Sequence, residues 1–178
     1  MNVTMLIVSI ALVISLASLL IAVGNARRLN IMGVGRPNLI LPEALPDGEA
    51  VPEVIRDALS AASPESRAGR LLLVVASGNC PACRSLAIDL NHQRARLGAL
   101  PMVVVDESQS DVAPFAEFLD FETPSVPDAG NKLKEALRVK VIPYSFVISD
   151  WRIVGHAVGS DVTTLTRLSA EIGAAERS

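Results

Sequence analysis

At 178 residues, the chain is long enough for one ordinary domain with an appendage. Its formal net charge is −3 and its isoelectric point is about 5.4, which argues against a nucleic-acid-binding protein. Aromatic residues make up only 3% of the chain, so we expect a core built mainly of Leu, Val, Ile and Ala.

The N-terminal segment is uncharged and mostly apolar from Val3 to Val23. As a helix it would span about 30 Å, enough to cross the hydrocarbon core of a bilayer. A cleaved signal peptide is the alternative, with a weak cleavage site near Gly24, but no basic residue precedes the run and such peptides have a shorter apolar stretch. We expect a transmembrane anchor at residues 1–24, a linker at 25–36 and a soluble domain at 37–178.

The soluble part opens with a turn signal, Asp47-Gly48, between the short apolar segments 38–41 and 49–51, a pattern typical of a β-hairpin. Pro52 suits the first position of a helix. The apolar residues of that helix are expected on one face, and they are Val54, Ile55, Ala58 and Leu59. Residues 71–76 are apolar without alternation, which predicts a central strand covered on both faces.

The two cysteines of the chain follow this strand at once, in the run Ser77-Gly78-Asn79-Cys80-Pro81-Ala82-Cys83. Pro81 again fits a first helical turn, and a helix is expected to continue to Leu97, with Leu86 and Leu90 on its inner face. A Cys-x-x-Cys at a strand-to-helix junction is typical of dithiol–disulfide exchange.

The remaining segments alternate strands and helices. We expect a strand at 102–105 closed by Asp106, a helix at 114–119 capped by Ser110 or Asp111, an irregular stretch with a short strand at 121–128, a helix at 132–139, a strand within 141–148, a hairpin turn at 149–152 with a returning strand at 153–154, and a helix from Asp161 to about 174. This order predicts an α/β sandwich on a mixed sheet.

The layout resembles the thioredoxin fold, and more narrowly the membrane-anchored TlpA-like family. Four landmarks carry the resemblance: residues 35–39 with 47–49, the Cys80–Cys83 motif, residues 128–143 ending in Ile142-Pro143, and the hairpin 150–154. The proline after Cys80, the anchor and the arginine-containing linker are similar to MauD-type accessory proteins of methylamine dehydrogenase maturation. The resemblance implies a cis bond before Pro143 that faces the cysteines.

The helix start gives the two cysteines different expected roles. The thiolate is the attacking species in disulfide exchange, and the free N–H groups and dipole of a helix N-terminus stabilise an anion at Cys80. Cys83, one turn later, can then attack a mixed disulfide at Cys80. We expect Cys80 as nucleophile and Cys83 as resolving thiol. The alternative is that both are ordinary buried thiols.

Client docking is expected beside this pair. The backbone of Ile142, next to Pro143, can pair with an extended client segment as the resemblance implies. Asn79, Pro81 and Ala82, which border the cysteines, complete the expected docking surface.

No cofactor is expected other than the redox-active disulfide Cys80–Cys83, and no metal. Zinc usually takes four ligands, and the chain has no third cysteine. His92 is expected on a helix surface and His156 at a strand end, both distant in sequence from the pair.

The sequence departs from the family pattern in two ways. Asn79 stands where relatives commonly carry Trp. The positions that would carry a buried acid beside the second cysteine are Val74 and Leu86, both apolar. Asp89 and Asp106 are the possible substitutes as proton acceptor for Cys83, although the first is more simply a solvated helix residue and the second a strand-end residue.

The sequence therefore predicts a membrane-anchored thiol–disulfide oxidoreductase acting on a cysteine-containing client protein in protein maturation, with a membrane protein as electron donor or acceptor. A non-catalytic client-binding module and, more weakly, metal delivery are the alternatives. Arg27, Arg28 and Arg36 after the apolar run favour a cytoplasmic domain. The family resemblance implies an extracytoplasmic one, which we take as the expectation.

Overall fold

The computed structural model describes residues 44–98, 100–108 and 112–175. All of the described residues belong to one compact unit, Pro42–Ser178. The predicted anchor, the linker and the first strand of the predicted hairpin lie outside the described residues. Within the described ranges, no helix has the length and apolar character needed to cross a membrane.

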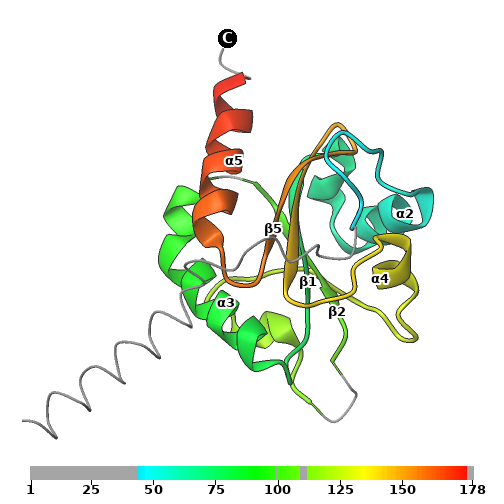
Figure 1. The fold of residues 1–178 in the computed structure, drawn as a ribbon, viewed down its shortest axis with the longest axis vertical. Helices are drawn as coiled ribbons and strands as arrows, with labels where there is room; N and C mark the ends of the chain where they lie inside the picture. The colour runs from blue at the N-terminus through cyan, green and yellow to red at the C-terminus, as the bar shows by residue number, and fades with distance from the viewer. Residues whose placement is uncertain (1–43, 99, 109–111, 176–178) are drawn as a thin grey trace, which may run out of the picture. The chain divides into compact units, whose positions relative to one another are not determined.

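Five strands form one mixed sheet in the order β3-β2-β1-β4-β5 (Figure 1). They are β1 (Leu71–Ala76), β2 (Met102–Asp106), β3 (Ser125–Pro127), β4 (Tyr144–Ser149) and β5 (Arg152–Val158). The central strand β1 runs parallel to β2 and antiparallel to β4, and all of its side chains are buried. The predicted mixed sheet, with its central strand covered on both faces, is therefore confirmed.

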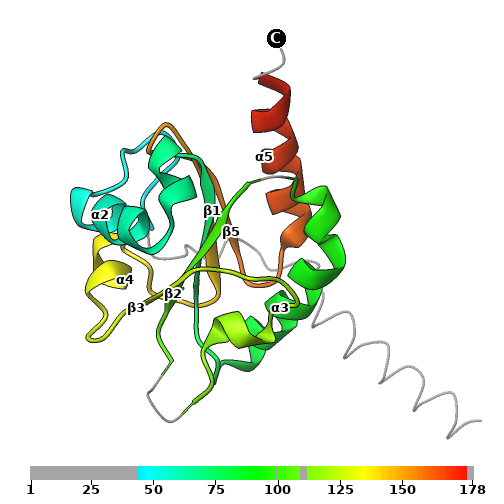
Figure 2. The same ribbon diagram turned by 180° about the vertical axis from the view of Figure 1, so that it is seen from behind.

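Helices cover both faces of this sheet, as the two opposite views show (Figures 1 and 2). One layer holds α3 (Pro81–Gln93) and α5 (Val162–Ala175), and the other holds α2 (Glu53–Ala62) and α4 (Lys132–Ala136). Three short 3₁₀ helices complete the described part of the chain: η1 (Pro64–Ala68), η2 (Arg94–Arg96) and η3 (Phe115–Phe118).

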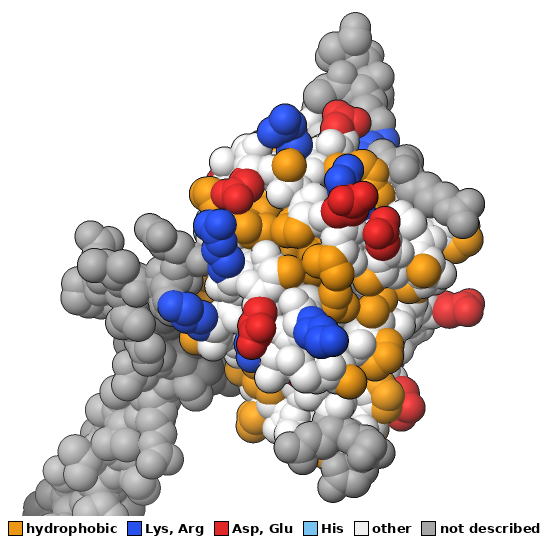
Figure 3. Space-filling model, turned by 90° about the vertical axis from the view of Figure 1, so that its right-hand side faces the viewer, with side chains coloured by type: hydrophobic (Ala, Val, Ile, Leu, Met, Phe, Trp, Pro, Cys, Tyr) orange, Lys and Arg blue, Asp and Glu red, His pale blue; other side chains and the backbone are white. Residues whose placement is uncertain are grey.

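Successive residues of β1 alternate between two cores because side chains of a strand point to opposite faces. Leu72, Val74 and Ala76 enter the core under α3 and α5, whereas the odd-numbered residues of β1 enter the core under α2 and α4. The outer surface of the α2 and α4 layer mixes hydrophobic and charged side chains (Figure 3). The cores are mainly aliphatic, as the low aromatic content predicted.

Several expectations about individual elements need correction. Val54 does not join the buried face of α2: it is 52% exposed, and only Ile55 and Leu59 of that helix are fully buried. The turn at Asp47-Gly48 is present, but Ala50 forms an isolated bridge with Arg152 of β5.

Three predicted helices are shorter than expected. The helix expected to continue to Leu97 ends at Gln93 as α3, and the 3₁₀ helix η2 follows it. The segment expected as a helix at 114–119 is only the 3₁₀ turn η3, which begins after Pro114, and its proposed caps lie outside the described residues. The helix expected at 132–139 is reduced to α4, which ends at Ala136. The cap of α5 is as expected, because Asp161 Oδ1 accepts a hydrogen bond from the Thr164 N–H at 3.1 Å.

Candidate functional site

Both cysteines lie at the junction between β1 and α3. Cys80 is the N-cap of α3, and its Sγ accepts a hydrogen bond from the Cys83 N–H at 3.3 Å. Pro81 follows at the first helical position, where a missing N–H costs no helical hydrogen bond. The N-terminus of α3 therefore directs a backbone donor at the Cys80 sulfur, an arrangement that stabilises a thiolate.

A tight turn before Cys80 holds this geometry. Only glycine fits at position 78, because a Cβ there would overlap the carbonyl oxygen of Ala113 in the chain that follows β2. The Gly78 carbonyl accepts a hydrogen bond from Arg84 Nε at 2.9 Å, and the same guanidinium stacks on the Phe118 ring at 5.2 Å from its centroid. Arg84 thus connects α3 to both the turn and η3.

The two sulfurs differ in exposure and in chemistry. Both are free thiols, with Cys80 half-buried and Cys83 0% exposed. Burial raises the pKa of the Cys83 thiol well above its ordinary value. A hydrogen bond with Cys80 and negative charge at Cys80 and Glu107 act in the same direction, while a backbone hydrogen bond from Ser77 opposes them. The buried thiol is therefore strongly held in its protonated form.

The segment before β4 faces the half-buried sulfur of Cys80. The Ile142–Pro143 peptide bond is cis, as the resemblance implied, and the Ile142 carbonyl oxygen lies 4.0 Å from Cys80 Sγ. Ile142 is half-buried and Pro143 is buried.

The residues beside the pair are open to solvent. Asn79, Pro81 and Ala82 are all exposed, and Asn79 Oδ1 accepts a hydrogen bond from the Ser77 hydroxyl. The structure thus brings together every residue that the sequence nominated for exchange and docking.

At the two positions that would carry a buried acid, Val74 and Leu86 are both 0% exposed, in an apolar core that also contains Cys83. The two possible substitutes for that acid are Asp106 and Asp89. Asp106 is buried, and each of its carboxylate oxygens accepts a backbone hydrogen bond: Oδ1 from the Ser108 N–H at 2.7 Å and Oδ2 from the Phe115 N–H at 2.6 Å. It fixes the chain after β2.

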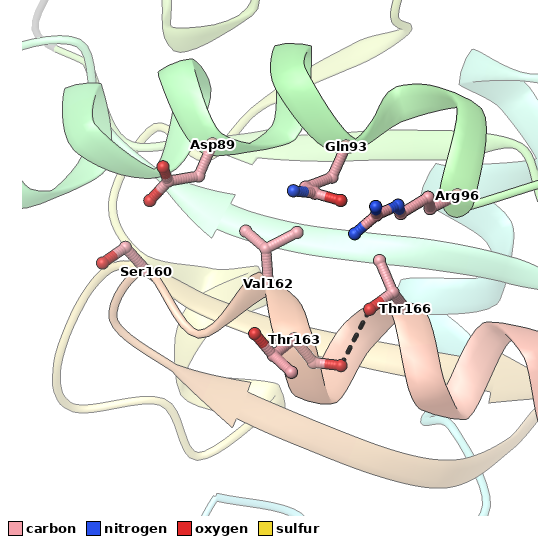
Figure 4. Close-up of a pocket in the computed structure, with 7 residues that line it drawn as sticks. All are labelled: Asp89, Gln93, Arg96, Ser160, Val162, Thr163 and Thr166. Carbon is pink, nitrogen blue, oxygen red and sulfur yellow. Dashed lines mark hydrogen bonds between the residues drawn. The ribbon is translucent and has the colours of Figure 1, made fainter.

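Asp89 lies in a different place, a hollow of about 250 Å³ between α3 and the start of α5 (Figure 4). The side chains around this hollow are mostly polar, and neither cysteine is among them: Asp89, Gln93, Arg96, Ser160, Val162, Thr163 and Thr166. A hydrogen bond of 2.8 Å from the Thr166 hydroxyl to the Thr163 carbonyl lies within it. Asp89 is thus not placed to take a proton from Cys83.

Sequence reasoning missed one charged residue near the buried thiol, Glu107. Its side chain is only 10% exposed, and its Oε2 lies 3.0 Å from Lys134 Nζ of α4. Its Oε1 is buried and has no hydrogen-bond partner among the described residues. An acidic residue directly after the strand that pairs with β1 was the available signal, because parallel strands end at the same edge of a sheet.

Within the described part of the chain, neither histidine forms a hydrogen bond or ion pair with the cysteines. His92 is exposed on α3, and His156 Nδ1 lies 3.0 Å from Asp47 Oδ1. No cluster of three or more His, Cys, Asp or Glu side chains suited to hold a metal occurs within residues 44–98, 100–108 and 112–175.

Trp151, the one tryptophan, belongs to the turn between β4 and β5. It packs against the core under α2 and α4. This is the hairpin position expected for it.

Comparison with solved structures identifies the fold. A candidate thiol:disulfide interchange protein DsbE from Chlorobium tepidum matches with a TM-score of 0.54 and 19% identity, over 74% of this chain and 99% of that chain. Peroxiredoxin Q from Xanthomonas campestris matches with a TM-score of 0.52 and 16% identity, over 72% and 99%. The chain has the thioredoxin-like fold. No protein-family model and no curated protein sequence matches it.

Proposed function

We propose that the protein is a thiol–disulfide oxidoreductase that acts on cysteines of a client protein through Cys80 and Cys83. The carrying observation is the unequal pair at the start of α3: a half-buried Cys80 sulfur that accepts the Cys83 N–H, beside a fully buried Cys83 thiol. The fold alone does not decide the chemistry, because function resides in sites built on a fold.

The reaction consists of two thiol–disulfide exchanges. In the reducing direction, the Cys80 thiolate attacks a client disulfide, forms a mixed disulfide and releases one client thiolate. Cys83 then loses its proton and attacks Cys80 Sγ, which forms the Cys80–Cys83 disulfide and releases the second client thiolate. The client gains two electrons that the pair loses, and the same steps in reverse oxidise a client dithiol.

The client binds across the surface beside Cys80. The Ile142 carbonyl, 4.0 Å from Cys80 Sγ, is placed to accept a backbone hydrogen bond from an extended client segment. Asn79, Pro81 and Ala82 are exposed around the sulfur and complete the docking surface. Asn79, a small polar residue, leaves room that a large aromatic side chain would fill.

We further propose a membrane-anchored, TlpA-like protein with a maturation role of the MauD type and an extracytoplasmic catalytic domain. The uncharged run from Val3 to Val23 supports the anchor. An anchor would raise the effective concentration of the domain at membrane clients and at a membrane electron donor or acceptor. Labelling of intact cells with a membrane-impermeant maleimide, before and after reduction, tests the orientation: cysteines that react only after lysis would place the domain in the cytoplasm.

Exchange itself is tested on the purified full chain in mild detergent. The protein is equilibrated in glutathione buffers of graded redox poise, and free thiols are then counted by alkylation and gel shift. We expect reversible interconversion between two free thiols and none, and a Cys83→Ser variant that retains a glutathione mixed disulfide at Cys80. A pair that stays in one state across all buffers would refute the proposal.

A client-binding module without turnover is the second candidate. The raised pKa of the buried Cys83 thiol, next to apolar Val74 and Leu86, favours it, because resolution of a mixed disulfide requires that thiol to ionise. Cys80→Ala and Cys83→Ala variants that retain full biological function would select this reading. Stoichiometric metal bound by the dithiol form would instead select metal delivery.

A further inference from the structure

The two chain segments that carry the expected docking residues hold only positive charge. Residues 77–88 contain the cysteine pair and one charged side chain, Arg84. Residues 138–148, which include the cis proline, contain two charged side chains, Arg138 and Lys140. Neither segment contains an acid, although the whole chain has a formal net charge of −3. The charge of these two segments is therefore opposite in sign to that of the chain.

Arg84 is fixed against the turn that precedes the exposed end of the pair. Its Nε donates to the Gly78 carbonyl at 2.9 Å, and Gly78 lies two residues before Cys80. Its guanidinium carbon lies 5.2 Å from the centroid of the Phe118 ring. These contacts use one N–H and one face of a planar group that has five N–H donors. Because the side chain is exposed, its other donors remain open to a ligand.

Two of the three cations have no counter-ion in the part of the chain that the structure describes. Arg138 Nη2 lies 3.9 Å from Glu49 Oε1. Arg84 and Lys140 are exposed, and neither forms an ion pair with a described carboxylate. Arg84 directly follows Cys83 on one segment, and Lys140 lies two residues before Ile142 on the other.

The acids after β2 do not neutralise Arg84. Each Asp106 oxygen accepts a backbone N–H, as described above. Glu107 is paired with Lys134 of α4. Glu117 of η3 is exposed and forms no ion pair with a described residue. The positive charge beside the cysteine pair is thus left for a partner to balance.

We propose that the client segment that docks beside Cys80 is acidic and that Arg84 selects it. The proposal rests on the thiol–disulfide exchange proposed above and names the chemistry of its client. The planar guanidinium suits a carboxylate, and a fixed side chain loses less conformational freedom when it binds one. Lys140 adds a second positive charge from the other segment. The Ile142 carbonyl aligns the client backbone, and Arg84 favours an acid next to the client cysteine.

Three short peptides test this preference, each with one cysteine blocked as a mixed disulfide with thionitrobenzoate. The residues on both sides of the cysteine are aspartates in the first peptide, asparagines in the second and lysines in the third. The reduced full chain, in excess and in a non-ionic detergent, attacks the peptide sulfur with its Cys80 thiolate. The peptide forms a disulfide with Cys80, and the coloured thionitrobenzoate thiolate leaves with the electron pair of the broken bond.

Each rate of colour release is divided by the rate of the same peptide with mercaptoethanol, so that the intrinsic reactivity of the peptide cancels. At low salt we expect the aspartate peptide to react about tenfold faster than the lysine peptide, with the asparagine peptide between them. Arg84→Gln should reduce this ratio to about threefold, and Arg84→Gln with Lys140→Gln to about one. Arg84→Lys keeps the charge and should retain most of the preference. Salt at about 0.5 M should also weaken it, because salt screens exposed charges.

Arg94 offers a matched control at the other end of α3. Its Nη1 donates to the Gly98 carbonyl at 3.4 Å, and its guanidinium carbon lies 4.7 Å from the centroid of the Phe121 ring. Arg94→Gln therefore removes the same kinds of contact and the same charge as Arg84→Gln, but away from the cysteines. It should leave the ratio between the peptides unchanged.

Several results would overturn the proposal. Equal normalised rates for the three peptides, or a preference for lysine, would show that the client is not selected by acidic charge. A preference that Arg84→Gln leaves intact, or that Arg94→Gln lowers equally, would show that Arg84 does not select. Equal slowing of all three peptides in Arg84→Gln would show that the side chain only supports the turn. Absence of colour release from every peptide would instead refute the proposed exchange, and the inference with it.

Discussion

Ionisation of the buried Cys83 thiol should make the stability of the dithiol form depend on pH. The side chain is 0% exposed, and burial is the main reason that its pKa is raised. In the unfolded chain a cysteine thiol ionises near pH ~8.5. Above that pH the folded state still holds a proton that the unfolded state has lost.

The sign and size of the pH dependence of stability follow from this difference in bound protons. The folded state binds one more proton than the unfolded state, so the free energy of unfolding falls as pH rises, by about 1.4 kcal/mol per pH unit. The contribution is fully present below pH ~8.5 and is lost progressively as the pH rises toward the raised pKa of the folded thiol. Between pH 9 and 10, a Cys83→Ala variant should lack this slope.

Trp151 provides the assay, because it is the single tryptophan and lies in the folded unit between β4 and β5. Its fluorescence would follow guanidinium unfolding of the full chain under reducing conditions. The series stops at pH 10 because the pKa of Tyr144 is also raised, by burial and by the charge of Asp47, and would add a loss of the same sign above that pH. Parallel slopes for the native chain and Cys83→Ala would refute the reasoning.

Three substitutions test the contacts that hold the turn and the chain after β2. Asp106→Ala leaves two backbone N–H groups without acceptors and should lower the free energy of unfolding by about 2–4 kcal/mol. A loss under about 0.5 kcal/mol in denaturant titration would contradict its role in holding the chain after β2. Gly78→Ala should push a Cβ against the Ala113 carbonyl oxygen, displace the turn and slow alkylation of the dithiol; an unchanged rate would mean that the turn adapts at no cost. Arg84→Ala loses the stack on Phe118 and the bond to the turn, and should cost about 1 kcal/mol in thermal unfolding.

Most of the fold could be predicted because its decisive segments carry strong local patterns. Residues 71–76 read as a covered central strand because six consecutive side chains are apolar, and each is buried. Pro81 and Asp161 marked the starts of α3 and α5 because proline and aspartate have specific places at helix N-termini. Segments without such marks were predicted less well.

The short helices show where prediction from the sequence fails. Residues 114–119 carry a helical pattern, but Pro114 and the hydrogen bond from the Phe115 N–H to Asp106 restrict the segment to one 3₁₀ turn. The expected helix from Lys132 likewise ends early, because Arg138 adopts a positive φ of 56° that stops α4. Tertiary contacts of this kind leave no signal in hydrophobic periodicity.

The candidate site could likewise be predicted only in part. The spacing of Cys80 and Cys83 identified the pair, and the family resemblance identified Pro143. Glu107 could not be distinguished from its neighbour Asp106 in the sequence, since both are acids at the end of one strand. Strand alternation separates them: Asp106 binds the backbone N–H of Phe115, in the core beneath α3, whereas Glu107 turns toward Lys134 on the other face. Which acid keeps a free oxygen depends on these partners.

The unequal exposure of the two thiols has a consequence for the order of events in the proposed exchange. A client can reach only Cys80, so the mixed disulfide forms on that sulfur whether the client is reduced or oxidised. The cost of ionising Cys83 is then met once per cycle, after the client is docked. The lifetime of the mixed disulfide is set by that step, and a protein that ionises Cys83 readily releases its client quickly. If Cys83 stayed protonated, the same geometry would hold the client covalently, which is how a binding module would behave.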